Sequence, residues 1–109
     1  MKGYKIFNED MTCRGFQYNV GETYTYDGDI GVCEAGFHFC ENMKDVYNYY
    51  GFNCDLPVCV VDAVGEVITK GDKSVTNKIK IIRKIALKTI LKELNLILYL
   101  GKIIENEKL

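Results

Sequence analysis

The residues best suited to chemistry lie around the only histidine of the chain, His38, in the stretch CEAGFHFCENMKDVYNYYGF. Cys33 and Cys40 flank it, and Cys54 and Cys59 follow. Cysteine and histidine are common ligands of structural zinc, but such sites are usually built from CxxC pairs. Here six residues separate Cys33 from Cys40, and four separate Cys54 from Cys59. We therefore predict packed free thiols, and neither a metal site nor a bound cofactor.

Nucleophilic catalysis is the second chemistry that this stretch suggests. Cys40 near His38 has the composition of a thiolate–imidazole pair. Two residues apart on one strand, however, their side chains run parallel, and no third group that would orient the histidine is evident. The chain also has no P-loop, no GxGxxG and no serine nucleophile elbow. We predict no catalytic residues, and we expect His38 to be half-buried and hydrogen-bonded.

Several short strands must position these residues. Alternation of apolar and polar residues, or dense valine content, predicts them at 3–8, 13–18, 23–26, 36–40, 56–69 and 78–85. A bend at Gly65 is expected to split the fifth, and the stretch KGDKSVTNK is expected to be a loop. The resulting fold class is α+β: a mainly antiparallel sheet of five or six strands, a middle helix and a C-terminal amphipathic helix.

The middle helix is predicted to begin after Asn42 and to end at Gly51. Its core side, together with the preceding strand, is expected to supply Phe37, Phe39, Met43, Val46, Tyr47 and Tyr50. Tyr49 should lean outward, where an aromatic ring can stack on a base or a nicotinamide. Core packing of the other aromatic residues is the competing use.

The last segment is expected to be helical, with more apolar residues than one contact with a sheet requires. The excess either wraps a groove of the domain or buries against a second copy of the chain. The residues at this candidate helix interface are Leu96, Tyr99, Leu100 and Ile103. We predict a single domain, 1–109, with a β-rich part (1–85) and a C-terminal helix (86–109).

Charge is unevenly distributed along the chain. Residues 1–66 carry eleven acidic and four basic side chains, whereas residues 67–109 carry four acidic and ten basic ones. The two halves either present opposite faces or interleave and cancel. An acidic partner-binding face is predicted at Asp27, Asp29, Glu34, Glu41 and Asp45. No apolar stretch is long enough to cross a bilayer, so a cytoplasmic protein without a membrane partner is expected.

Several motifs, from GYKIF and CRGFQY to GFHFC and GDKSVTNKI, resemble an uncharacterised domain family seen in phages, prophages and Firmicutes genomes. The resemblance covers residues 2–85. It implies a small protein of a mobile element and carries no established activity.

The layout GFHFCENMKDVYNYYG followed by PVCVVDAVGEV is more remotely similar to ADP-ribosyltransferases of the poly-ADP-ribose polymerase type. That likeness implies that Arg14 contacts NAD and that His38 occupies the place of an aromatic hydroxyl group. With Tyr49, these residues form a candidate ligand pocket. The family needs a glutamate on a late strand, where this chain has Thr76, Asn77 and Lys78.

We expect a non-enzymatic protein that binds and inhibits a host defence protein such as a CRISPR nuclease, by competing with nucleic acid for a basic channel. An NAD-binding relative of ADP-ribosyltransferases, active or degenerate, is the first alternative. A nucleic-acid-binding module using the lysines from Lys70 to Lys92 is the second. A homodimer through the C-terminal helix is compatible with each of them.

Overall fold

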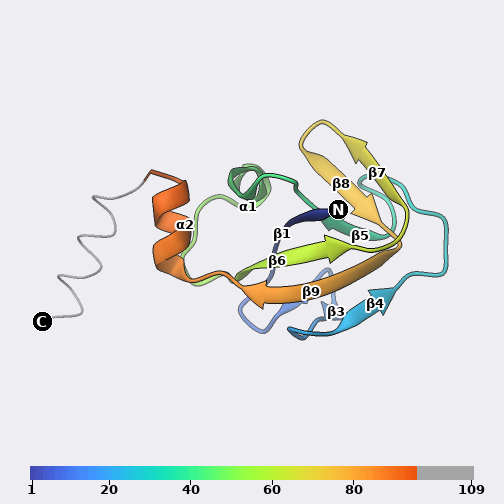
Figure 1. Cartoon of the computed structure of the whole chain (residues 1–109), viewed down its shortest axis with the longest axis horizontal. Helices are drawn as coiled ribbons and strands as arrows, with labels where there is room; N and C mark the ends of the chain where they lie inside the picture. Colours follow the sequence, from blue (N-terminus) through green and yellow to red (C-terminus); the bar gives the residue numbers. More distant parts are fainter. Residues whose placement is uncertain (96–109) are drawn as a thin grey trace, which may run out of the picture.

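The structure is a computed structural model, and it describes residues 1–95. The predicted helix interface at Leu96, Tyr99, Leu100 and Ile103 lies outside the described residues. Figure 1 shows the strands crossing at one end of the molecule and helix α2 (Leu87–Glu93) at the other.

Nine strands and three short helical segments follow one another in the described residues. The strands are β1 (Lys2–Ile6), β2 (Thr12–Cys13), β3 (Phe16–Gln17), β4 (Thr23–Thr25), β5 (Phe37–Phe39), β6 (Val58–Ala63), β7 (Val67–Lys70), β8 (Lys73–Thr76) and β9 (Lys78–Lys84). The helical segments are a 3₁₀ turn (Met43–Val46), α1 (Tyr47–Tyr50) and α2. The α+β class is confirmed.

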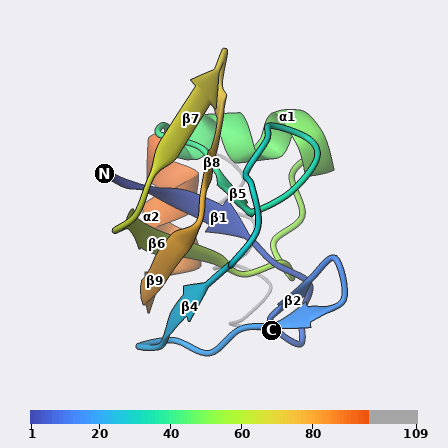
Figure 2. The same cartoon turned by 90° about the vertical axis from the view of Figure 1, so that its right-hand side faces the viewer.

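The strands form three antiparallel sheets, so the prediction of one sheet of five or six strands was wrong. The largest sheet has the order β1-β6-β9-β4, the second has the order β5-β8-β7, and β2 and β3 form a separate hairpin. The backbone pairing of β1 with the end of β5 is an isolated bridge between Tyr4 and Cys40, with N to O distances of 2.7 and 2.9 Å. Figure 2 shows the second sheet rising away from the first.

Two sequence predictions fail because a two-residue turn joins short strands in each stretch. The stretch CRGFQY is not one strand: Arg14 and Gly15 both have positive φ, and they reverse the chain between β2 and β3. The stretch KGDKSVTNK is not a loop. Gly71, at a φ of 62°, closes a hairpin from Lys70 to Lys73 that brings β8 against β7. The bend at Gly65 does separate β6 from β7.

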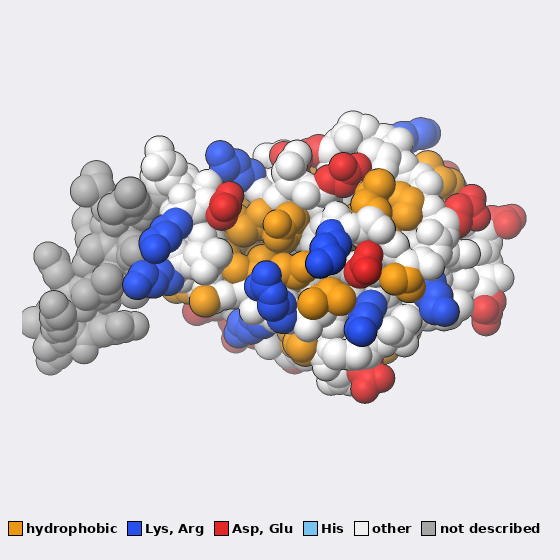
Figure 3. Space-filling view, in the orientation of Figure 1, with side chains coloured by type: hydrophobic (Ala, Val, Ile, Leu, Met, Phe, Trp, Pro, Cys, Tyr) orange, Lys and Arg blue, Asp and Glu red, His pale blue; other side chains and the backbone are white. Residues whose placement is uncertain are grey.

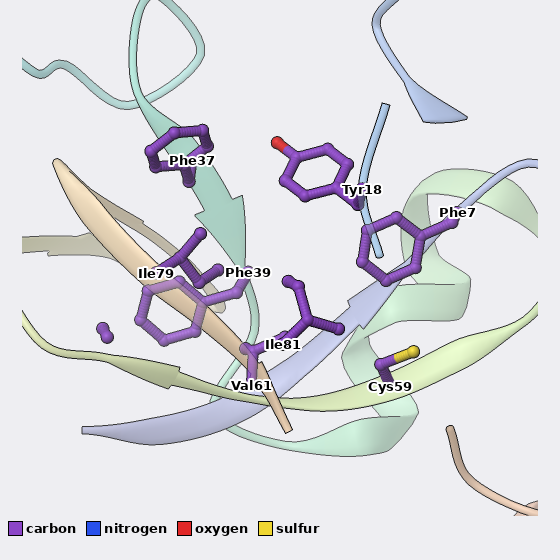
Figure 4. Close-up of a cluster of buried hydrophobic side chains, with 9 residues drawn as sticks. Phe7, Tyr18, Phe37, Phe39, Cys59, Val61, Ile79 and Ile81 are labelled. Carbon is purple, nitrogen blue, oxygen red and sulfur yellow. The ribbon is translucent and has the colours of Figure 1, made fainter. Parts of the chain in front are cut away.

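The main core lies between the large sheet, β5 and the segment around the β2–β3 hairpin (Figure 4). Phe37 and Phe39 from β5 meet Ile79 and Ile81 of β9 there, as alternation predicted. Phe7 and Tyr18 close its other side, with ring centroids 5.2 Å apart. A second buried cluster beneath the middle helix includes Ile6, Cys40, Met43, Val46, Val58, Ile85 and Ile90.

The middle helix is shorter and less regular than its pattern predicted. Asn42 precedes the 3₁₀ turn but makes no side-chain cap bond, and Gly51 ends α1 at a φ of 67°. Met43 and Val46 are buried, as predicted. Tyr50 is 54% exposed, so its assignment to the core was wrong. With only one α-helical turn, residue 50 lies beyond the part of the helix that faces the core.

Helix α2 extends the fold beyond β9, and it buries Ile90 and Leu91. Within residues 1–95, no helix has the length and apolar character needed to cross a membrane.

Candidate functional site

A cavity of about 120 Å³ opens where β1, the β2–β3 hairpin, β5, α1 and β8 converge. All three residues of the predicted ligand pocket, Arg14, His38 and Tyr49, line it. The other lining residues are Tyr4, Lys5, Ile6, Cys13, Phe39, Cys40, Val46, Tyr50 and Lys73. We call this space the lysine cavity.

Lys5 lies at the base of the cavity, with 6% of its surface exposed. Its Nζ atom donates a 2.6 Å hydrogen bond to the carbonyl oxygen of His38. The rings of Phe7 and Tyr18 lie with their centroids 5.8 and 5.6 Å from Nζ. The alternation of β1 had placed Lys5 opposite the buried Ile6, but the segment that follows β1 folds back and covers this second face as well.

Burial is the main reason why the pKa of Lys5 is lowered from its usual value. Arg14 acts in the same direction, whereas the Cys13 and Cys40 thiols act against it. The Cys13 thiol lies close enough to the Lys5 amine and to the Tyr50 hydroxyl to influence the pKa of both groups. Neither polar partner of Lys5 is therefore a carboxylate.

Arg14 is positioned by an unfavourable backbone conformation at the hairpin tip. Its φ is 53°, and that of Gly15 is 77°. Two successive positive φ values are typical of the turns that best match the twist of a hairpin, and asparagine–glycine is the preferred pair there. Arginine in the left-handed region costs about 1 kcal/mol. The tip of the hairpin thus carries an arginine beside the cavity, at a position where another residue, such as asparagine, would make the protein more stable.

His38 is held neutral. The backbone N–H of Cys33 donates a 2.9 Å hydrogen bond to its Nε2 atom, so that nitrogen is an acceptor and Nδ1 carries the hydrogen. Burial, followed by the positive charges of Lys5, Arg14 and Lys73, lowers the pKa of His38 to about 4. With Nε2 occupied in this way, His38 is neither a poised general base nor a metal ligand.

Tyr49 and Lys73 form the outer rim of the cavity. The Nζ atom of Lys73 lies 4.0 Å from the centroid of the Tyr49 ring and 3.6 Å from Sγ of Cys33. The Tyr49 hydroxyl donates a short hydrogen bond to Asp72, whose other oxygen accepts one from Asn48. The Asp72 carboxylate is therefore held by Tyr49 and Asn48 and does not line the cavity. Its hydrogen bond with Tyr49 is the main reason why the pKa of Tyr49 is raised to about 12.

All five cysteines are free, but the prediction that they are packed holds fully only for Cys40 and Cys59. Cys40 is buried, and burial raises the pKa of its thiol to about 11, so it is protonated at neutral pH. Cys33 and Cys54 are exposed, and Cys59 is fully buried in the main core. Within the described part of the chain, no cluster of His, Cys, Asp or Glu has a metal-binding arrangement.

The predicted acidic face divides into two groups. Glu41 and Asp45 line a neighbouring cavity of about 230 Å³ together with Asp72. Asp27, Asp29 and Glu34 lie in the segment between β4 and β5. On the face shown in Figure 3, acidic and hydrophobic side chains lie between the basic ones.

The lysine cavity has a distinctive charge composition. Of the described residues that line it, three are basic and none is Asp or Glu. Among residues 1–95, none of the three forms an ion pair with a carboxylate. The sequence did not predict Lys5, Cys13 or Lys73 as lining residues. A lysine between the apolar residues Tyr4 and Ile6 was the only hint of the first, and the last was assigned to a loop.

Comparisons with known proteins complete this description. Neither the curated proteins nor the solved structures gave a match. Among protein families, the model described as "Domain of unknown function (DUF7666)" matches residues 1–93, which include every residue that lines the lysine cavity. The chain therefore belongs to the DUF7666 family of domains of unknown function.

Proposed function

We propose that the protein binds a small anionic ligand in the lysine cavity. The observation that carries the proposal is the lining itself: Lys5, Arg14 and Lys73 converge there with no carboxylate among the described lining residues. Their positive charges all act on His38. Of the three, Lys5 is buried, Lys73 is half-buried and Arg14 is exposed. A buried cation is ordinarily paired with an anion, because burial of an unpaired charge is costly. A bound phosphate or carboxylate would supply the missing partner.

The volume of the cavity limits the ligand. At ~30 Å³ for each water molecule, a cavity of about 120 Å³ has room for only a few heavy atoms. Sites that enclose drug-sized molecules measure ~300–1,000 Å³. Inorganic phosphate or a short-chain carboxylic acid therefore suits the cavity better than a whole nucleotide. Tyr49 and Tyr50, 46% and 54% exposed, offer apolar contact at the rim.

Thermal unfolding in a series of anions tests this proposal. At ten times Kd, a ligand that binds only the folded state stabilises it by about 1.4 kcal/mol and raises Tm by roughly 6–11 °C. Phosphate also stabilises proteins non-specifically. The decisive comparison is therefore Arg14→Gln, expected to lose the phosphate-specific shift, against Arg83→Gln, expected to keep it. Arg83 is an exposed arginine on β9, away from the cavity. Equal shifts in all three proteins would refute the proposal.

NAD binding is a second candidate because Arg14 and His38, the residues implied by the resemblance to ADP-ribosyltransferases, line one cavity. Against it stand the small volume of this cavity and the hydrogen bond that occupies Nε2 of His38. NAD belongs in the same unfolding series. A shift with NAD and none with phosphate would favour this candidate over a small-anion site.

Inhibition of a host defence protein stays a prediction. The cavity formed by Glu41, Asp45 and Asp72 supports an acidic contact with a basic partner. Charge reversal at Asp45 should weaken capture of a stoichiometric host nuclease, whereas reversal at Asp29, in the other acidic group, should not. Equal effects would contradict a contact centred on this cavity.

A further inference from the structure

The amine of Lys5 is held in an environment that suits a nucleophile. Its Nζ atom has two polar neighbours, the carbonyl oxygen of His38 and the Cys13 thiol. Aromatic rings of Phe7 and Tyr18 occupy other directions. Among the described residues, no carboxylate pairs with this amine to hold it in the protonated form.

Nucleophilic attack requires the neutral amine, and a desolvated lysine supplies more of it at a given pH. Burial, with help from Arg14, shifts the pKa of Lys5 in that direction. Arg14 and Lys73 lie around the same cavity and keep it attractive to an anion when Lys5 is neutral. The cavity thus combines an amine nucleophile with two cations that would orient an acid group.

We propose that Lys5 forms an imine with the carbonyl carbon of a small 2-oxo acid, whose carboxylate lies against Arg14 and Lys73. The inference rests on the proposed function, because the carboxylate of the ligand would occupy the proposed anion site. It further requires that the ligand has a carbonyl group next to this carboxylate. A 2-oxo acid of three carbons has six heavy atoms, which agrees with the size of the cavity.

The reaction balances as a condensation. The Lys5 nitrogen adds to the carbonyl carbon, and the resulting carbinolamine loses its oxygen as water, which takes both hydrogens of the neutral amine. The product is a C=N bond with no change in oxidation state. The Cys13 thiol lines the same cavity beside Lys5 and Tyr50, so it is a group that can carry a proton between the nitrogen and the departing oxygen.

Reductive trapping tests this inference on the intact protein. Pyruvate is added with sodium cyanoborohydride, whose hydride reduces the imine to a stable secondary amine. We expect one adduct per chain, heavier by pyruvic acid less one oxygen atom, and peptide mapping should place it at Lys5. Lactate, which has the carboxylate but no carbonyl group, should give none. Absence of an adduct, or an adduct distributed over exposed lysines, would overturn the inference.

Matched variants separate this inference from the proposed function. Lys5→Met keeps an apolar side chain of similar length and should abolish the adduct, whereas Lys2→Met, at an exposed position of the same strand, should not. Arg14→Gln should lower trapping at subsaturating pyruvate by about tenfold, since it removes a charge-assisted contact. If phosphate raises Tm in a way that depends on Arg14, but no pyruvate adduct forms at Lys5, the anion site is supported and imine formation is refuted. If Arg14→Gln leaves trapping at Lys5 unchanged, the proposed contact between the ligand carboxylate and Arg14 is refuted.

Discussion

The Nζ atom of Lys5 lies 2.6 Å from the carbonyl oxygen of His38, and this contact joins the first strand of one sheet to the first strand of the other. The backbone link between these strands is confined to the bridge at Tyr4 and Cys40. The lysine that lines the cavity therefore also helps to hold its two walls together.

Replacement of Lys5 should change how stability depends on pH. Its lowered pKa means that, between that pKa and 10.5, the unfolded chain binds more protons than the folded one. The free energy of unfolding of the wild type should therefore rise with pH in this window. Lys5→Met should remove that rise while Lys2→Met keeps it, as followed by urea unfolding at several pH values. A rise of the same size in Lys5→Met would show that the amine of Lys5 does not cause it.

The titration of His38 can be followed directly, since it is the only histidine. With a folded pKa of about 4 and an ordinary value of 6.5, its ring proton signals in NMR should titrate with a midpoint near pH 4. The stability that His38 contributes is present above pH 6.5 and is lost as the pH falls toward 4. After allowance for solvent screening of this half-buried ring, it amounts to about 1–2 kcal/mol. A midpoint near 6.5 would contradict the burial of His38 beside the positive charges of Lys5, Arg14 and Lys73.

Arg14→Asn should stabilise the protein in the absence of ligand. Asparagine tolerates the positive φ at this position and is the preferred partner of a following glycine in such a turn. We expect a gain of up to about 1 kcal/mol by chemical denaturation. Arg14→Gln removes the same charge without this backbone benefit, so it serves as the control. A loss of stability in Arg14→Asn alone would mean that the arginine side chain holds the hairpin.

Gly36 shapes the entry to β5 and hydrogen-bonds to His38 through its backbone. Its φ is 110°, and a Cβ atom there would lie 2.7 Å from Cγ2 of Val75. Gly36→Ala should cost about 2–5 kcal/mol, from backbone strain and overpacking together. Gly21→Ala, at a φ of 91° with open space around it, should cost only the strain, about 1–2 kcal/mol. Similar losses in both variants would show that the approach to Val75 is unimportant.

The alternation of apolar and polar residues and the position of a glycine predicted those features of the fold that depend on neighbouring residues in the sequence. Phe37 and Phe39 alternate with His38 and are buried, and Gly65 does divide the valine-rich stretch. Lys5 could not be predicted as buried, because the second face of β1 is covered only when later parts of the sequence, around Tyr18 and His38, fold over it.

The site was only half predictable for the same reason. Arg14, His38 and Tyr49 were grouped from sequence resemblance and position, and they do line one cavity. Lys73 was assigned to a loop, because glycine, aspartate and serine in KGDKSVTNK are turn residues by composition. Their actual role is to form the hairpin whose second strand brings Lys73 to the rim.

The anion site in the lysine cavity is best tested by an NMR titration with phosphate, which replaces chloride at constant ionic strength. We expect saturable shifts at the backbone amides of residues 13–15, His38 and Lys73, and their loss in Arg14→Gln. Shifts confined to the lysine-rich strand β9, or no saturable shifts at all, would contradict an anion site in the lysine cavity.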